Sequence, residues 1–428
     1  MRARTLKTVK ILYVSQYYPP EMGAPAARVA ELSNHWVRDG HEVTVLTGFP
    51  NHPTGVLHPE YREKLRRLHM QEVINGVNVV RTWLLPFPNG KAYERMLNYS
   101  SFCVSAACSG LSISRPDVVI ATSPQLLVGL AGWWLAKWKR VPFIFEVRDL
   151  WPESLTAVGM ARADSLLNRT LSNIAQFLYR RAHHVVIVSP AFEEHLVRLR
   201  NVPREKISTV ENGVETDLFS PQAEYQELRN GLGDGRFVVC YIGTMGMAHG
   251  LSTLLDAAAV LQITRPEVLF LLVGEGSDKQ RIRDLAASRG LNNIRLIDQQ
   301  PRERIPAYIG ASDACLVMLK KSELFKTVIP TKMLEFMACA RPIILGVDGH
   351  ARSIVETANA GIFVEPENAA QLADTIVELA DNAALRENLG RNGRRHIQNH
   401  FSRERTAKLY INVIRAVLGD AMTRSAAA

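Results

Sequence analysis

One segment of the chain places charged side chains at a spacing that could bind a phosphate and a ribose. It reads KTVIPTKMLEFMACARPII and begins at Lys326. Pro330 can sit at or beside the first turn of a helix, so the residues after it are expected to be helical. Lys332 and Glu335 then share one helix face. The lysine could meet phosphate, and the carboxylate could accept two hydrogen bonds from a ribose diol. A solvated ion pair between the two side chains is the alternative.

A second charged cluster lies in the string EVRDLWPES. Arg148 and Asp149 directly follow an apolar run that is expected to form a strand. Charged groups at the carboxyl end of a strand usually face a cleft, because burying them unpaired is costly. The alternative is a structural salt bridge, either between Arg148 and Asp149 or between Glu146 and Arg148.

Two glycine-containing turns are weaker candidates. Gly23 precedes the first expected helix, and a helix N-terminus suits an anion, although an ordinary strand–helix turn explains it equally well. Asn212 and Gly213 form a turn signal that permits a positive φ, and a purely structural corner is the alternative. Neither half of the chain has GxGxxG after its first strand, which argues against a dinucleotide-dependent oxidoreductase.

Short apolar runs rich in Val and Ile alternate with helical patterns twice along the chain, which predicts two doubly wound α/β domains. The expected strands are 10–15, 42–47, 77–82, 117–122, 142–147 and 184–189, and then 236–242, 268–273, 294–297, 314–318, 342–345 and 361–364. The polar stretch 220–235 is the expected linker. We therefore expect domains at 1–219 and 220–401, and a final helix at 402–428 that packs back on the first domain.

Composition agrees with a cytoplasmic protein of this kind. The 428 residues are 47% hydrophobic and 22% charged, and the five cysteines are scattered without a CxxC pair, so no metal site is expected. The basic N-terminus is followed by an apolar run too short for a signal peptide, and no stretch reaches the length of a membrane span.

The charge is uneven and suggests an anionic partner, which could be a membrane surface, a phosphorylated acceptor or nucleic acid. Net charge is +9, and residues up to 220 hold 26 Lys and Arg against 19 Asp and Glu, or +7. The string GWWLAKWKR places Trp133, Trp134 and Trp138 among three basic residues, a pattern suited to a membrane surface. The alternative is that most of this string is a buried helix. No nucleic-acid motif accompanies the charge.

Several strings, taken in order, resemble the retaining family-4 glycosyltransferases of the GT-B fold, and more narrowly their bacterial surface-polysaccharide branch, similar to the L-fucosamine transferase type. They are GAPAARVAELSNHWVRDGHEVTVLT, EVRDLWPES, ENGVETDLF, YIGTMGMAHGLSTLLDAA, LLVGEGSDK and IPTKMLEFMACARPII. The resemblance implies two Rossmann-like domains that face a cleft, with the nucleotide-sugar donor held mainly by the C-terminal domain and a glycan or lipid-linked acceptor by the N-terminal one. It also implies no required metal and no other cofactor.

The resemblance assigns roles by position. Glu335 would bind the ribose hydroxyls, and Gly23 would lie near the diphosphate and sugar. The remaining donor-contacting positions are Gly243, Thr244, His249, Gly250, Gln299, Gln300 and Pro301. Arg148 and Asp149 stand where many members place a histidine.

The chain departs from the family pattern at three places. Thr244 and His249 stand where members often have Arg and Lys, Thr327 stands where many have Glu, and Gly23 is single rather than paired. Lys326 and Lys332 are the candidates to supply the missing positive charge.

The expected reaction is transfer of a sugar, with retention, to a glycan or lipid-linked acceptor in surface polysaccharide synthesis. The cytoplasmic enzyme would contact the inner face of the membrane. A nucleotide-sugar 2-epimerase on the same fold and a non-catalytic nucleotide-sugar-binding subunit are the alternatives.

Overall fold

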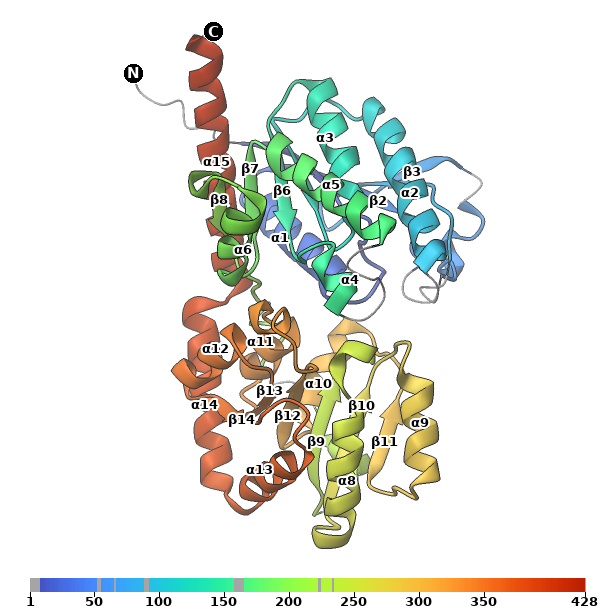
Figure 1. The fold of residues 1–428 in the computed structure, drawn as a ribbon, viewed down its shortest axis with the longest axis vertical. Helices are drawn as coiled ribbons and strands as arrows, with labels where there is room; N and C mark the ends of the chain where they lie inside the picture. Colours follow the sequence, from blue (N-terminus) through green and yellow to red (C-terminus); the bar gives the residue numbers. More distant parts are fainter. Residues whose placement is uncertain are drawn as a thin grey trace. The chain divides into compact units, whose positions relative to one another are not determined.

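The chain divides into two compact units of α/β architecture (Figure 1). The computed structural model describes residues 8–51, 55–64, 67–87, 92–157, 165–221, 225–232 and 235–427. Unit 1 comprises Met1–Glu211 and Glu404–Ala428, and unit 2 comprises Asn212–Arg403. The sequence pattern placed these limits at 219/220 and 401/402. The expected linker 220–235 lies inside unit 2, and the helix α7 (Gln226–Leu232) occupies part of it, so it does not separate the units.

Unit 1 is built on an eight-stranded sheet of order β3-β4-β2-β1-β5-β6-β7-β8, in which β3 alone is antiparallel to its neighbour. Its strands are β1 (Lys10–Val14), β2 (Glu42–Gly48), β3 (His69–Ile74), β4 (Val77–Thr82), β5 (Val118–Thr122), β6 (Phe143–Val147), β7 (His184–Ile187) and β8 (Ile207–Thr209). All six strands predicted for this half are confirmed, while β3 and β8 were not predicted.

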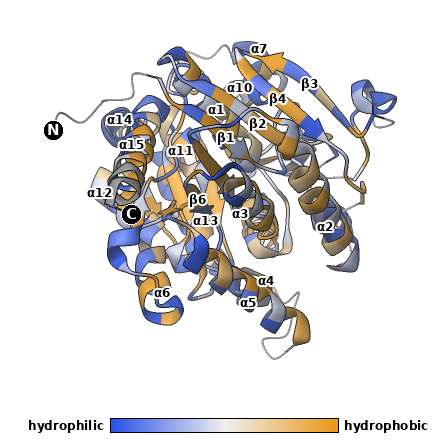
Figure 2. Ribbon diagram, turned by 90° about the horizontal axis from the view of Figure 1, so that it is seen from above, coloured by the Kyte–Doolittle hydropathy of each residue, from blue (hydrophilic) through white to orange (hydrophobic). Residues whose placement is uncertain are grey.

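Helices cover both faces of this sheet. They are α1 (Ala24–Arg38), α2 (Ala92–Ser109), α3 (Val128–Lys139), α4 (Glu153–Ala157), α5 (Leu166–Arg181), α6 (Ala191–Arg200) and α15 (Arg403–Ala427), with short 3-10 turns η1 (Pro59–Tyr61), η3 (Gly110–Ser112) and η4 (Arg204–Lys206). Figure 2 shows α1 and α3 on opposite sides of the hydrophobic strands β1 and β2. Trp36 of α1 is fully buried against Tyr410 of α15, with ring centroids 5.3 Å apart, so the C-terminal helix completes the core of unit 1.

Unit 2 repeats the design with six parallel strands in the order β11-β10-β9-β12-β13-β14. They are β9 (Phe237–Ile242), β10 (Val268–Val273), β11 (Ile294–Ile297), β12 (Ala314–Met318), β13 (Ile343–Gly346) and β14 (Gly361–Phe363), and all six were predicted. Central strands such as β10 are buried along their whole length, which explains their continuous apolar sequence.

The two faces of the second sheet carry separate hydrophobic cores. Helices α8 and α13 pack on one face, and α10, α11, α12 and α14 pack on the other. The helices of unit 2, besides α7, are α8 (Ser252–Thr264), α9 (Lys279–Ser288), α10 (Ile305–Gly310), α11 (Thr331–Ala338), α12 (His350–Ala358), α13 (Ala369–Asp381) and α14 (Ala383–His400), with turns η5 (Met247–His249), η6 (Arg302–Arg304) and η7 (Phe325–Thr327).

Candidate active site: two half-sites at strand ends

In unit 2, the loops that follow β9 and β10 make a close backbone contact at two glycines, Gly243 and Gly274. Gly243 has φ 131° and Gly274 has φ 148°, values that disfavour any residue with a side chain. A Cβ atom on Gly274 would lie 2.0 Å from the carbonyl oxygen of Gly243. The amide of Gly243 donates to the carbonyl of Val273 at 2.9 Å, which joins the two loops. This close backbone contact fixes Gly243 at the carboxyl end of the sheet.

Helix α11 presents the two charged residues of the KMLEF segment. Pro330 is its N-cap, as its position in the sequence predicted, and Met333, Leu334 and Met337 are fully buried against the sheet. The apolar side of the helix therefore holds its first turn rigidly at the strand ends. Lys332 and Glu335 do not form the ion pair considered as an alternative, because the ammonium group of Lys332 lies over an aromatic ring and Glu335 pairs with an arginine.

The ammonium group of Lys332 lies over the ring of Tyr241, 3.9 Å from its centroid. Its Nζ is buried and has no hydrogen-bond partner. A Cβ on Gly243 would come within 2.9 Å of this nitrogen, so the glycine is what leaves room for it. Burial lowers the pKa of Lys332 to about 7, against the opposing effect of Glu335. The ammonium group of Lys332 thus lies next to the loop of Gly243 without a counter-ion.

The carboxylate of Glu335 is nearly buried and pairs with a residue outside its own helix. Arg302 of η6 donates from Nη1 to Glu335 Oε1 at 2.8 Å. The guanidinium carbon of Arg302 lies 4.8 Å from the centroid of the Phe219 ring, and Phe219 is itself fully buried. The carboxylate is therefore held in one orientation.

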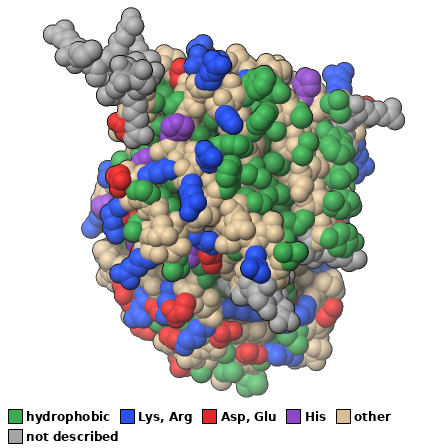
Figure 3. Space-filling model, turned by 45° about the horizontal axis from the view of Figure 1, so that its top comes forward, with side chains coloured by type: hydrophobic (Ala, Val, Ile, Leu, Met, Phe, Trp, Pro, Cys, Tyr) green, Lys and Arg blue, Asp and Glu red, His purple; other side chains and the backbone are tan. Residues whose placement is uncertain are grey.

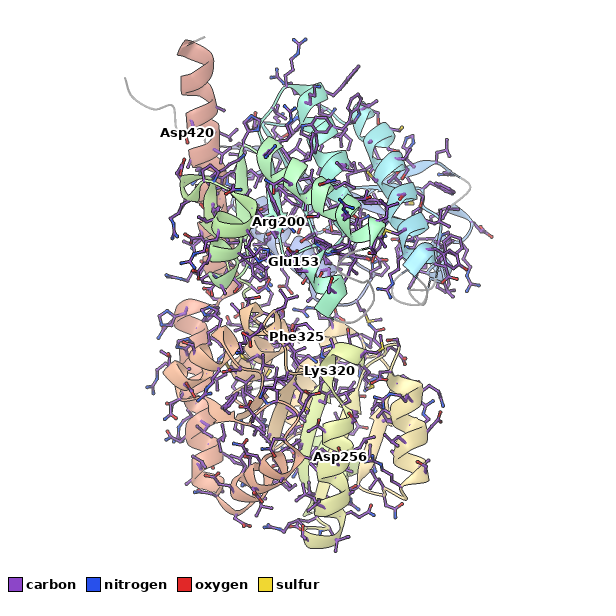
Figure 4. The ribbon with its side chains drawn as sticks, in the orientation of Figure 1. Glu153, Arg200, Asp256, Lys320, Phe325 and Asp420 are labelled. Atoms are coloured by element: carbon purple, nitrogen blue, oxygen red, sulfur yellow. The ribbon has the colours of Figure 1, made fainter. Side chains whose placement is uncertain are left out.

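His249 does not replace the positive charge that the family pattern places nearby. Burial, together with the charge of Lys332, lowers its pKa to about 3, so the imidazole is neutral at neutral pH. Its Nδ1 lies 3.3 Å from the carbonyl oxygen of Met318. Thr244 is exposed, and Gly250 adopts φ 59° beside the side chain of Lys320, which is labelled in Figure 4.

Two other predicted groups lie at the surface of unit 2. Lys326 pairs with Glu323 at 2.7 Å, which raises its pKa, and its other charged neighbours are Asp348 and Glu365. These charged neighbours differ from those of Lys332. The segment Gln299–Pro301 follows β11 and leads into η6, where Arg302 begins.

In unit 1, the structure brings Gly23 and Arg148 to the same place. Gly23 is the N-cap of α1 with φ 121°. The guanidinium of Arg148 donates to the carbonyl oxygens of Ala24 at 3.0 Å and Pro25 at 3.2 Å, in the first turn of that helix. Burial lowers the pKa of Arg148 to about 10, despite the attraction of Glu146. Arg148 therefore fixes the start of α1.

Neither salt bridge considered for Arg148 forms among the described ion pairs. Glu146 instead binds Arg28 of α1, with Oε1 accepting from Nε at 2.9 Å and from Nη2 at 2.8 Å, and both side chains are fully buried. Tyr13 donates to the other carboxylate oxygen at 2.7 Å. Asp149 is left partly exposed with a pKa that burial raises to about 6.

Glu153, the last acidic residue of EVRDLWPES, turns away from this cluster. It starts α4 and lies against Arg200 of α6 at 2.5 Å (Figure 4) and His195 at 3.2 Å. Burial alone would raise the pKa of Glu153, but a hydrogen bond from His195, a backbone hydrogen bond and the charge of Arg200 lower it to about 2. Its role is to attach α4 to α6.

Asn212 and Gly213 form the point at which unit 1 passes into unit 2. Neither adopts a positive φ, so the freedom that the turn signal allowed is not used. The preceding carbonyl of Glu211 accepts from Arg28 Nη1 at 3.0 Å.

The sequence analysis missed four residues that organise these half-sites: Arg28, Tyr241, Gly274 and Arg302. Gly274 stood in the string LLVGEGSDK and could have been singled out as a glycine directly after a strand. The other three act through tertiary contacts between distant segments, which no local pattern reports. Among the described residues, no group of three or more His, Cys, Asp or Glu side chains is placed to hold a metal ion.

Comparison with known families identifies both units. A glycosyl transferase 4-like domain matches residues 23–213, and a glycosyl transferases group 1 domain matches residues 224–396. A protein of Escherichia coli K12 named as a colanic acid biosynthesis glycosyl transferase, WcaI, is 24% identical over 95% of this chain and 100% of its own length.

Solved structures show the same fold at low sequence identity. Sucrose-phosphate synthase from Thermosynechococcus elongatus has a TM-score of 0.76 at 20% identity and covers 96% of this chain and 99% of its own. Anabaena HepE, solved with UDP and glucose, has a TM-score of 0.71 at 17% identity, covering 95% and 99%. These comparisons confirm the GT-B fold predicted from the sequence and do not favour an epimerase. The chain is a glycosyltransferase of the GT-B fold, made of a glycosyl transferase 4-like domain followed by a glycosyl transferases group 1 domain.

Proposed function

We propose that unit 2 binds the diphosphate of a nucleotide-sugar donor at the first turn of α11, and that Lys332 is the cation that meets it. The single observation behind this proposal is the buried Nζ of Lys332, which has no hydrogen-bond partner. A buried cation is costly without a counter-ion, and a phosphate oxygen would supply one. The backbone amides of the α11 N-terminus favour an anion at the same place. Glu335 then receives the ribose hydroxyls.

The chemistry of transfer explains why such a cation is useful. The bond between the anomeric carbon and the donor phosphate oxygen breaks, and a bond to an acceptor hydroxyl oxygen forms. Negative charge grows on the departing phosphate, which also takes up the proton of the acceptor hydroxyl. Lys332 and the helix N-terminus stabilise that charge. Retention of configuration and the absence of a required metal follow from family resemblance and belong to the same proposal.

On the acceptor side, we assign Asp149 as the polar group of unit 1 that contacts the acceptor or the transferred sugar. Asp149 lies at the carboxyl end of β6. Its neighbour Arg148 already donates its hydrogen bonds to carbonyl oxygens at the start of α1. Replacement Asp149→Asn keeps the shape and removes the charge. We expect lower transfer at unchanged thermal stability. A fully active Asp149→Asn enzyme would contradict the assignment.

The proposed acceptor is a glycan or lipid-linked glycan of a bacterial surface polysaccharide. This rests on the family branch and on the name of the Escherichia coli relative. The decisive test incubates the purified chain with radiolabelled nucleotide-sugars, with and without lipid-linked acceptor, and analyses both products. Transfer that requires acceptor and falls in Lys332→Ala supports the proposal. Conversion of the nucleotide-sugar without acceptor would indicate an epimerase, and binding without turnover would indicate a non-catalytic subunit.

We further propose that unit 1 docks on an anionic membrane surface through α2 and α3, which pack against each other. Only part of the expected tryptophan patch is exposed in the structure. Trp133 packs against Phe177 with centroids 4.8 Å apart, and Lys139 is buried and donates to the carbonyl of Leu111. Trp134 and Trp138 remain 40% and 61% exposed.

The neighbouring helix adds an exposed stripe that the sequence analysis did not recognise. Its members, spaced along one side of α2 and the following turn, are Tyr93, Leu97, Val104 and Leu111. Figure 3 shows hydrophobic side chains gathered on the face in view, with Lys and Arg beside them. Lys137 and Arg140 are exposed next to the two tryptophans, so the surface combines apolar anchors with positive charge. No described helix is long and apolar enough to span a bilayer.

Liposome co-sedimentation tests this docking surface. Wild-type protein should bind vesicles that contain phosphatidylglycerol and be released by high salt. Trp138→Ala and Lys137→Glu should each weaken binding severalfold, while Ile263→Ala, which removes an 84% exposed apolar residue of unit 2, should not. Absence of binding at low salt, or equal binding by all variants, would overturn the assignment of this surface.

A further inference from the structure

We infer that Arg302 is a positioning residue that makes Glu335 selective for a ribose over a deoxyribose. This inference rests on the proposed donor site and assigns a specificity-determining role within it. Arg302 lies 33 residues before Glu335, in a different loop, and belongs to none of the motifs that indicated the site. The structure nevertheless gives it the one ion pair made by Glu335 among the described residues.

The ion pair fixes the carboxylate in a defined way. Arg302 Nη1 donates to Oε1 of Glu335 at 2.8 Å, and Glu335 has a side-chain exposure of 12%. An ionised carboxylate accepts at about four lone-pair positions, so Oε2 and the remaining position on Oε1 are available to hydroxyl donors. A pair of vicinal hydroxyls needs the two oxygens in a definite plane. Arg302 sets that plane.

Arg302 is itself held from two sides. Its guanidinium carbon lies 4.8 Å from the ring centroid of Phe219, which is fully buried. Its backbone begins η6 directly after Pro301, the N-cap of that turn. A planar guanidinium that stacks on an aromatic ring and pairs with a carboxylate loses few conformations on donor binding. The donor therefore meets a preformed acceptor group.

Lys332 cannot take over this role, although it lies in the same helix. Its ammonium group is 3.9 Å from the Tyr241 ring centroid and makes no hydrogen bond. The two cations of the site therefore have different roles. Lys332 has no hydrogen-bond partner and can bind an incoming anion, whereas Arg302 orients the carboxylate of Glu335. Without Arg302, Glu335 would be free to swing toward Lys332 and neutralise it.

The test measures binding of UDP, GDP and ADP and of their 2′-deoxy counterparts by calorimetry. Wild type should prefer the ribose form of whichever nucleotide it binds by about tenfold or more, because a hydroxyl bound to a charged acceptor is lost in the deoxy form. Arg302→Ala should reduce that preference to about twofold or less, and Arg302→Lys should restore part of it. Arg304→Ala, an exposed arginine in the same turn, is the matched control and should leave it unchanged.

A double-mutant cycle separates positioning from direct contact. If Arg302 acts through Glu335, the double variant Arg302→Ala/Glu335→Ala should bind no more weakly than Glu335→Ala alone. Equal loss of ribose and deoxyribose binding in Arg302→Ala would show that Arg302 contacts the nucleotide elsewhere and would overturn the inference. Wild-type protein that binds no nucleotide at all would instead contradict the proposed donor site itself.

Discussion

Glu335 is the residue whose removal should affect donor binding most. Glu335→Ala deletes a nearly buried carboxylate that we assign to the ribose diol. Loss of charge-assisted hydrogen bonds costs about 1.5–3 kcal/mol, so nucleotide affinity should fall about 10- to 150-fold. Calorimetry with the nucleotide that the wild-type protein binds measures this loss of affinity. Glu378→Ala, which removes an exposed glutamate of α13, is the control, and an unchanged affinity in Glu335→Ala would rule out the assignment.

Lys332 should make donor binding depend on pH. Its pKa of about 7 in the free protein is lowered by burial, and a bound diphosphate would raise it. Binding therefore takes up a proton above pH 7, and affinity should fall as pH rises, approaching tenfold per unit. An intact nucleotide-sugar is the right ligand, because its diphosphate has no titration in this range.

The control for this pH dependence is Lys332→Arg, whose guanidinium stays charged throughout. Its affinity should be flat between pH 6.5 and 9. The pKa of His249, at about 3, lies well outside that interval, so the histidine does not contribute. A wild-type profile as flat as that of the arginine variant would show that Lys332 does not meet the diphosphate.

Sequence reasoning identified Lys332 and Glu335 correctly as residues of one helix but could not assign their partners. A spacing of three along a helix permits an ion pair, and the competing contacts came from Tyr241 and Arg302. Those residues are distant in sequence, and their approach depends on how the strands of unit 2 are ordered. For the same reason the Glu146–Arg28 pair was missed, because its two ends lie 118 residues apart.

At the scale of elements, the contact between the β9 and β10 loops should tolerate no side chain. Gly274→Ala would place a Cβ 2.0 Å from the carbonyl oxygen of Gly243 and force the loop beside Lys332 to move. We expect loss of nucleotide binding together with reduced stability. Gly290→Ala, also at a positive φ but with nothing within 4 Å, should cost only about 1–2 kcal/mol and keep binding. Thermal unfolding and calorimetry distinguish these outcomes.

The start of α1 depends on Arg148 in unit 1. Arg148→Ala removes the donors to the carbonyls of Ala24 and Pro25 and should destabilise unit 1 by about 1–3 kcal/mol without unfolding it. Transfer should fall because Gly23 loses its fixed position. If the variant melts early but its folded fraction is fully active, the role of Arg148 is structural alone.

The elements themselves were largely predictable because most strands are central and buried. Such strands are continuous apolar runs, and all twelve that were predicted from this pattern are present. β3 was not predicted because it is an edge strand whose residues alternate in exposure. The hairpin turn after it, Asn75–Gly76, carries positive φ at both residues and was the signal available in the sequence.

For the molecule as a whole, the C-terminal helix should matter to unit 1 and not to unit 2. Tyr410→Ala removes a fully buried ring that packs against Trp36, at a cost of about 3–5 kcal/mol. We expect one of two thermal transitions to shift. Added nucleotide should still raise the midpoint temperature of the other transition, that of unit 2, because a ligand stabilises only the unit that binds it. Leu409→Ala, at a 44% exposed position, should shift neither.

The assignment of α15 to unit 1 also has a consequence for synthesis on the ribosome. Unit 2 is a continuous segment, Asn212–Arg403, whereas the core of unit 1 includes residues near the end of the chain. The ribosome adds about 5–20 residues per second, so α15 is synthesised roughly 10–40 s after β8, the last strand of the first sheet. The second domain can thus fold before the first is complete. During that interval the apolar face around Trp36 is not yet covered by α15 and is exposed to other apolar surfaces.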